Sequence, residues 1–334
     1  MKKIFVLFIV LILNCNEVFA SENFFNEDWW KTATVEDVEA EIANGADVNA
    51  KDVLDKTKGF TALMFAVALN ENPEIIKVLI NAGADVNAKT ESGEIKGLTV
   101  LMLASGWNKN PEVIKILINA GADVNAKIES GEAKDGTALM SAIFENKNPE
   151  VIKALIDAGA DVNAYSTAEG GGTALIFAAQ DSKNPEVIKM LIDAGADVNA
   201  KSDDGDTALM KAARENIQIV KMLIDAGADV NAKDTYGHTA LYYAKLYKKQ
   251  EIMEFLQAYQ NNFNEFDEMF AECYSTQNIG SYANKFCECA IKTAINALGP
   301  ADKEKAKDAF DDARAGTFKN LIQKGKSAAF KQCY

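Results

Sequence analysis

The sequence predicts an all-α protein in which repeated helix pairs stack into a solenoid, and three observations lead to this prediction. The six letters GADVNA occur six times, starting at Gly45, Gly83, Gly121, Gly159, Gly195 and Gly227. Apolar residues at helical spacing precede each copy, and a threonine with a short apolar stretch follows one loop later. A single helix pair cannot bury its own apolar face, so the pairs must stack on one another.

The cleanest repeat runs from residue 202 to residue 232 and explains each element in order. Thr207 is placed to cap a short first helix, because its hydroxyl can accept a hydrogen bond from a free amide of the first turn. A second helix is predicted before Gly227, since the position after a helix end often needs a left-handed backbone. The apolar faces are formed by Leu209, Ala212 and Ala213 in the first helix and by Ile219, Val220, Leu223 and Ile224 in the second.

The pattern D-x-x-G-x-T-A-L-x-x-A-A followed by I-V-x-x-L-I-x-x-G-A-D-V-N-A resembles the ankyrin repeat from about Trp29 to Tyr259. The family's T-P-L-H is changed in every repeat. It reads Thr-Ala-Leu-Met at Thr61, Thr137 and Thr207, Thr-Val-Leu-Met at Thr99, Thr-Ala-Leu-Ile at Thr173 and Thr-Ala-Leu-Tyr at Thr239. The resemblance implies that the missing histidine would tie neighbouring repeats by hydrogen bonds. We therefore expect apolar packing to replace those bonds here.

The spacing between GADVNA copies falls from 38 to 32 residues, and the extra residues lie in two places. Asn-Pro-Glu starts the second helix of four repeats, because asparagine caps, proline presets the first residue and the acid favours the helix dipole. The other extra residues lengthen the loops Lys51–Gly59, Lys89–Gly97, Lys127–Gly136 and Tyr165–Gly172. The resemblance implies that these loops form hairpin fingers, and that the long fingers deepen a groove toward the N-terminal end.

The first 20 residues have the order of a secretory signal peptide: two lysines, an apolar run at 4–13 and a small residue, Ala20, at the cleavage point. The run is too short to span a bilayer, and no later segment approaches that length. We therefore expect a periplasmic or secreted protein that is not an integral membrane protein; lipid attachment at Cys15 is the weaker alternative. The predicted domains are the signal peptide at 1–20, the repeat array with its caps at 21–260 and a helical C-terminal domain at 261–334.

The remaining cysteines all lie in the last quarter of the chain, at Cys273, Cys287, Cys289 and Cys333. An even number in an exported chain predicts two disulfides, which would staple a small helical domain with a thin core. Cys287 and Cys289 point to nearly opposite sides of one helix, so one is expected to pair with Cys273 and the other with Cys333, in an order left open. Redox chemistry at these cysteines is the alternative. The spacing does not favour zinc, since the paired close ligands of a ribbon or finger are missing.

The chain is acidic, with 49 Asp and Glu against 35 Lys and Arg, and its net negative charge lies between Ser21 and Asn262. Such a surface repels phosphate backbones and anionic headgroups, so neither nucleic acid nor a membrane surface is an expected partner. No enzyme is predicted, and no cofactor or metal: the chain lacks the glycine motifs of nucleotide sites. Its one histidine, His238, lies in a turn where we expect it to be solvated and outside any catalytic triad.

The resemblance implies a protein partner, bound by the finger tips and by the exposed end of the first helix of each repeat. The predicted partner-binding residues are Leu69, Trp107, Phe144, Glu145, Gln180, Asp181, Arg214 and Glu215. Leu69, Trp107 and Phe144 would form an apolar strip in the deepened groove, and exposed aromatic clusters are common binding hot spots. The alternative is that these three side chains fold inward under the fingers and pack.

Aromatic residues mark both ends of the array. Trp29 and Trp30 are expected to seal its N-terminal end, and Tyr242, Tyr243 and Tyr247 to join the last repeat to the C-terminal domain. The predicted function is a monomeric, non-enzymatic protein-binding scaffold outside the cytoplasm. Two alternatives stay open: a thiol-disulfide-active protein whose array only selects substrates, and a secreted effector that binds a host protein.

Overall fold

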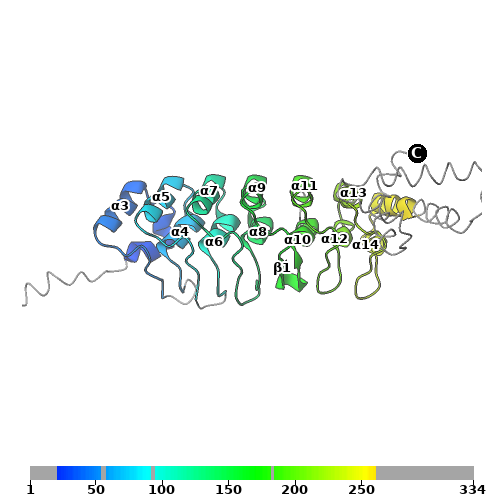
Figure 1. The fold of residues 1–334 in the computed structure, drawn as a ribbon, viewed down its shortest axis with the longest axis horizontal. Helices are drawn as coiled ribbons and strands as arrows, with labels where there is room; N and C mark the ends of the chain where they lie inside the picture. Colours follow the sequence, from blue (N-terminus) through cyan, green and yellow to red (C-terminus); the bar gives the residue numbers. More distant parts are fainter. Residues whose placement is uncertain (1–20, 54–57, 92–94, 182–183, 261–334) are drawn as a thin grey trace, which may run out of the picture. The chain divides into compact units, whose positions relative to one another are not determined.

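The computed structural model describes residues 21–53, 58–91, 95–181 and 184–260 (Figure 1). The chain divides after Asp181 into two compact units, and each is described by itself. The first unit comprises the described residues up to 181, and the second unit comprises those from 184 onward. The predicted signal peptide, disulfides and C-terminal domain lie outside the described residues.

The first unit has two rows of helices, and its loops extend beyond the second row (Figure 1). The row farther from the loops, here called the outer helices, consists of α3 (Val35–Ala43), α5 (Pro73–Asn81), α7 (Pro111–Asn119) and α9 (Pro149–Asp157); the row next to the loops is called the inner helices. The inner helices are α4 (Ala62–Leu69), α6 (Val100–Trp107), α8 (Ala138–Ser141) with its π-helical continuation η2 (Ala142–Asn146), and α10 (Ala174–Asp181). The short elements are η1 (Glu22–Phe25), α2 (Glu27–Trp30), η3 (Ala168–Gly170), and the antiparallel pair β1 (Tyr165–Ser166) and β2 (Gly172–Thr173).

The second unit repeats the arrangement. Its outer helices are α11 (Pro185–Asp193) and α13 (Ile217–Asp225), its inner helices are α12 (Ala208–Ala212) and α14 (Ala240–Leu246), and residues 250–260 are helical. Apolar side chains from both rows form the core, such as Leu63 and Ile76 in the first unit and Leu209 and Val220 in the second, each at most 1% exposed. The predicted all-α solenoid of helix pairs is confirmed.

Helix starts follow the predicted capping chemistry. The hydroxyl of Thr207 accepts a hydrogen bond from the backbone of Met210 at 3.4 Å, and the threonines that begin α4, α6 and α8 do the same. Thr239 makes no such bond at the start of α14. The Asn-Pro-Glu starts of α5, α7, α9 and α11 are confirmed, each with the asparagine side chain accepting from the glutamate backbone at 3.0 Å.

The asparagine of the GADVNA turn bonds to the same turn of the next repeat. Nδ2 of Asn87 donates to the carbonyl of Gly121 at 2.9 Å, and its Oδ1 accepts from the backbone N–H of Asp123 at 2.8 Å. The same two bonds are made by Asn49, Asn125 and Asn199. Ahead of the last repeat, the residues at the position of the missing histidine are buried and apolar, as apolar packing there requires: Met64, Met102, Met140, Ile176 and Met210. In addition, asparagine side chains hydrogen-bond one repeat to the next.

A second asparagine ladder lies at the ends of the inner helices of the first unit. Asn108 directly follows α6, is 2% exposed, and donates from Nδ2 to the carbonyls of Val67 at 2.8 Å and Asn70 at 3.0 Å. Asn70 makes two matching bonds to carbonyls on its N-terminal side, and Asn146 makes one, to the carbonyl of Asn108. Buried carbonyls need such partners, so this ladder holds the ends of neighbouring inner helices in register.

The long fingers of the first unit are hairpins that contact one another. In the second finger, the backbone of Thr90 donates to Leu98 at 3.0 Å and accepts from Gly97 at 2.8 Å. The third finger reaches back through Glu129, whose N–H donates to the carbonyl of Lys96 at 2.8 Å. Gly97 has φ of +87°, and a Cβ atom there would lie 2.7 Å from the nitrogen of Glu129. Glycine is therefore required where the two fingers meet.

Aromatic side chains close the N-terminal end of the first unit. Trp30 is fully buried, and its Nε1 donates to the carbonyl of Phe24 at 3.0 Å. Phe24 is 1% exposed, with its ring 5.7 Å from that of Trp30, and the ring of Trp29 meets that of Trp30 at 4.8 Å. Trp30 is thus buried in the way that the predicted sealing role requires.

Candidate interaction surface

The residues of the first unit predicted to contact a partner lie at the ends of the inner helices. Trp107 ends α6 with 51% of its surface exposed, whereas Leu69, the last residue of α4, is half-buried. Glu145 and Gln180 are exposed. Asp181 ends α10, and its side chain is not among those that the structure describes. Trp107 is therefore the exposed member of the predicted apolar strip.

Phe144, the third member of that strip, lies in the π-helical turn η2. The turn is closed by a hydrogen bond from the backbone of Lys147 to the carbonyl of Ala142 at 2.8 Å. Phe144 is half-buried, and its ring packs against Phe177 of α10 with 4.7 Å between ring centroids. Phe144 thus follows, in part, the inward-packing alternative that the sequence left open.

Glu145 lies beside the residue that precedes Trp107. A Cβ atom placed on Gly106 would be 3.7 Å from Cβ and 3.8 Å from Cγ of Glu145, an ordinary van der Waals distance. Within the described part of the chain, the carboxylate of Glu145 has no hydrogen bond or ion pair. The surface around Trp107 therefore combines an exposed indole with an unpaired carboxylate.

Ion pairs tie the fingers of the first unit to one another. Lys51 of the first finger pairs with Glu91 of the second. Glu129 of the third finger pairs with two lysines of the second, Lys89 at 2.6 Å and Lys96 at 2.9 Å. Hydrogen bonds from Lys89 and Lys96 lower the pKa of Glu129 to about 2. Ion pairs therefore connect the first finger to the second and the second finger to the third.

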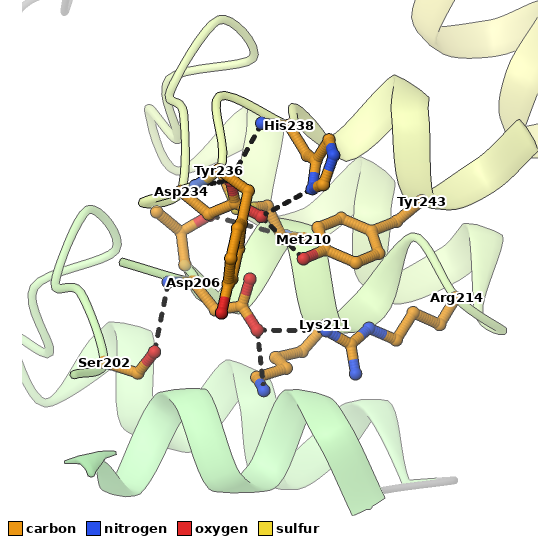
Figure 2. A network of polar contacts seen from close by, with 10 residues as sticks. Ser202, Asp206, Met210, Lys211, Arg214, Asp234, Tyr236, His238 and Tyr243 are labelled. Carbon is orange, nitrogen blue, oxygen red and sulfur yellow. Dashed lines mark hydrogen bonds and ion pairs between the residues drawn. The ribbon is translucent and has the colours of Figure 1, made fainter. Parts of the chain in front are cut away.

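Arg214, a predicted partner-binding residue of the second unit, is half-buried and held by its neighbours (Figure 2). Its Nη2 atom lies 3.0 Å from Oδ2 of Asp206, which also pairs with Lys211 at 2.9 Å. Its guanidinium carbon lies 4.5 Å from the ring centre of Tyr243. Glu215, the other predicted residue of this repeat, is exposed. Arg214 therefore has a structural role, and Glu215 is the more accessible of the two.

Asp234 joins the last finger to α14 (Figure 2). Its Oδ1 accepts hydrogen bonds from the backbone N–H groups of Tyr236 and His238, both at 2.8 Å, and its Oδ2 accepts one from the Tyr243 hydroxyl at 2.6 Å. Burial favours the protonated carboxyl, but these hydrogen bonds outweigh it and lower the pKa of Asp234. Burial and the bond to Asp234 together raise the pKa of Tyr243.

His238 is not the solvated turn residue that the sequence led us to expect. Its side chain is half-buried, and its ring stacks on Tyr242 with 3.7 Å between centroids and 6° between planes. Its Nδ1 atom lies 3.3 Å from Oδ2 of Asp234. The turn is folded back onto the inner helix, which brings the imidazole against an aromatic face.

The helix pairs, their GADVNA turns and their finger hairpins match a known family. The family model of ankyrin repeats (3 copies) matches residues 33–128, 88–166, 127–202 and 175–267. These matches join into one stretch that covers well over half of the chain. The chain belongs to the ankyrin-repeat family. A comparison of this ankyrin-repeat protein with curated proteins gives no match.

Two features are absent from the described residues of the ankyrin array. In these residues, no group of three or more His, Cys, Asp or Glu side chains is placed to hold a metal ion. None of the described helices is long and apolar enough to cross a membrane. Among the described residues, the carboxylate of Asp206 binds Lys211 and Arg214 through Oδ2. The carboxylate of Asp234 accepts hydrogen bonds from the Tyr243 hydroxyl and from the backbone N–H groups of Tyr236 and His238.

The polar network around Asp206 and Asp234 in the second unit of the ankyrin array was not predicted, although the sequence contains a signal for it. Asp206 and His238 stand directly before their threonines, where the first unit has Phe60, Leu98, Gly136 and Gly172. The same repeats expose tyrosines: Tyr236 is 75%, Tyr242 is 40% and Tyr247 is 47% exposed. A change from apolar to polar at one repeat position would have pointed to this network.

Proposed function

We propose that this ankyrin-repeat protein is a non-enzymatic scaffold that binds another protein through the inner helices of its first unit. The single observation that supports this most is the exposure of Trp107, whose large apolar side chain is 51% exposed at the end of α6. Tryptophans of this kind are frequent hot spots, because their burial by a partner removes much apolar surface from water.

The backbone under Trp107 is rigid, which favours binding further. Asn108 follows it directly and is fixed by its two hydrogen bonds to carbonyls of the preceding repeat. Leu69 and Phe144, at the corresponding ends of the neighbouring inner helices, are half-buried and therefore keep part of their apolar surface available. A platform that is already ordered loses less conformational entropy when it binds.

The proposed location of this function is outside the cytoplasm, in the periplasm or in secreted form. The proposal is supported by the order of charged, apolar and small residues in the first 20 positions. Mass spectrometry of the protein from its native source would identify the N-terminus. A chain that starts at Ser21 supports export, and one that retains residues 1–20 contradicts it.

Site-specific photo-crosslinking tests the binding surface. A photoreactive phenylalanine analogue would replace Leu69, at the corresponding end of α4, in one chain, so that Trp107 stays in place. In a matched control it would replace Lys115, an exposed residue of the outer helix α7. We expect one crosslinked partner from position 69 and none from position 115, with equal thermal stability of the two variants. Equal crosslinking from both positions, or none from position 69, would contradict the proposal.

A further inference from the structure

We propose that the inner face of the first unit takes a basic segment of its partner, with a lysine or arginine side chain placed between Trp107 and Glu145. This inference rests on the proposed function and gives the partner its chemistry. Two independent observations lead to it: the charge of the first unit as a whole, and the presence of an exposed indole and an unpaired carboxylate on two adjacent inner elements, α6 and η2.

The negative charge of the array is concentrated in its first unit. Residues 21–181 contain 26 Asp and Glu against 13 Lys, with no arginine, which gives a net charge of −13. Residues 182–262 contain 12 acidic and 10 basic residues, a net charge of −2. The field of the first unit therefore attracts a cationic partner and speeds its association, whereas that of the second unit does so far less.

Trp107 and Glu145 provide the local site for such a cation. A lysine or arginine is attracted to the face of an indole, most strongly where water is excluded, and a carboxylate adds an ion pair. The two residues come from adjacent inner elements, and Cβ of Glu145 lies at an ordinary van der Waals distance, 3.7 Å, from a Cβ atom placed on Gly106, the residue before Trp107. The exposed indole supplies apolar surface for the aliphatic part of the same cationic side chain.

The carboxylates of the fingers are less suited to receive the cation. Glu91 and Glu129 are already paired with lysines of neighbouring fingers, so they have less to offer a partner. Glu145, exposed and unpaired among the described residues, is therefore the carboxylate next to Trp107 that can receive a basic side chain.

The test selects peptides from a random phage-displayed library against the full chain and measures the binding of the strongest one by fluorescence anisotropy. We expect the selected peptides to place a lysine or arginine next to a bulky apolar residue. Glu145→Gln should weaken binding ~10-fold, the size expected for the loss of one partly desolvated ion pair. The matched control is Glu150→Gln, which removes the same charge from the outer helix α9.

Charge reversal sharpens the test. Glu145→Lys should weaken the binding of the basic peptide more than Glu145→Gln does. A peptide with its basic residue changed to glutamate should recover binding to the Glu145→Lys variant. Peptides that need Trp107 but are not basic, or that ignore Glu145→Lys, would overturn this inference and leave the proposed function standing. Peptides that ignore both Trp107→Ala and Glu145→Lys, or a selection that enriches none, would overturn the two together.

Discussion

The two units differ at one position of the inner helices, the residue that lies four places after the threonine that precedes each helix. In the first unit these residues include Phe65, Leu103 and Phe177, which are 2%, 4% and 3% exposed. In the second unit they are Lys211, which pairs with Asp206, and Tyr243, which bonds to Asp234. Ser141 of α8, whose hydroxyl donates to the carbonyl of Thr137 at 3.2 Å, is the exception in the first unit. In the other described inner helices, this position is apolar in the first unit and polar in the second.

The difference follows the length of the fingers. From the glycine of GADVNA to the next threonine the first unit has 16 or 14 residues, and the second unit has 12. The long first finger ends in Phe60, whose ring lies 5.4 Å from that of Phe65. A longer finger provides more atoms to cover the inner helix, so the residues beneath it can be apolar. Where the finger is short, polar side chains that bond to one another are compatible with partial exposure.

The largest expected effect is in the second unit, at Asp234. Asp234→Ala leaves the Tyr243 hydroxyl and the N–H groups of Tyr236 and His238 without their acceptor, so we expect a loss of ~3 kcal/mol in the free energy of unfolding. Urea unfolding measures the loss, and hydrogen exchange locates it. Exchange should rise in the second unit first, because a repeat depends mainly on its neighbours. An equal rise of hydrogen exchange in both units would mean that the polar bonds of Asp234 do not stabilise the second unit more than the first.

Glu215→Ala is the control for that variant, since Glu215 is an exposed carboxylate of the same unit. We expect it to change the free energy of unfolding by less than ~0.5 kcal/mol. A control loss as large as that of Asp234→Ala would mean that net charge, and not the hydrogen bonds of Asp234, stabilises the second unit.

The next effect is in the first unit, at the buried ladder. Asn108→Ala removes three hydrogen bonds: those to the carbonyls of Val67 and Asn70 and the one that Oδ1 accepts from the backbone N–H of Asn110. The change should cost ~2 kcal/mol in the free energy of unfolding. Asn119→Ala, at the exposed end of α7, is the matched control and should be nearly silent. Hydrogen exchange should rise in the helices α4 and α6. If the ladder variant is as stable as the control, the hydrogen bonds of Asn108 add nothing measurable to the apolar packing of the first unit.

These polar ladders mark the limit of what could be predicted from the sequence. The helix pairs could be predicted because caps, stripes and glycine stops are local signals, read within one repeat. The asparagine of GADVNA was visible, but its role depends on the distance between successive turns, which only stacking determines. The bonds of Asn87 to Gly121 and Asp123 join residues more than thirty positions apart.

The candidate surface was predictable in position and less so in detail. Trp107 is exposed at the helix end that the repeat alignment indicated. Phe144 was harder, because Thr137–Asn146 has the same length as the matching stretch of its neighbours, yet it ends in a π-turn. Its bulky ring, where neighbours have Ala68 and Gly106, meets Phe177 of the next repeat, a tertiary contact that no local signal encodes.

A smaller effect, the difference between two glycine variants, is expected where the fingers meet. Gly97→Ala puts a Cβ atom 2.7 Å from the nitrogen of Glu129, in a backbone with φ of +87°. Gly121→Ala is the control, because it has φ of +92° but nothing within 4 Å of the added atom. We expect each variant to lose ~1 kcal/mol in the free energy of unfolding, because alanine is strained in this backbone conformation. Gly97→Ala should lose roughly 1 kcal/mol more, because its Cβ atom also contacts Glu129. Thermal melts measure both, and equal losses would mean that the fingers separate at little cost.

The smallest expected effect concerns the charges on the fingers, and it depends on pH. The pKa of Glu129 is lowered to about 2, below the value of about 4.3 for an unfolded glutamate. A lowered pKa in the folded state adds stability that is present above about pH 4.3 and is lost as pH falls toward 2. The melting temperature of Glu129→Gln should therefore lie below that of the wild type at neutral pH, by a gap that narrows in acid and in high salt.

Glu132→Gln, on the same finger, provides the control, because Glu132 is exposed and has no ion pair among the described residues. Its melting temperature should follow that of the wild type at every pH. A gap for Glu129→Gln that does not change between about pH 6 and about pH 3 would contradict the expectation. Lys89 and Lys96 would then stabilise the fingers through packing of their aliphatic chains. The fingers of the first unit would be stabilised, like its inner helices, by packing and not by ion pairs.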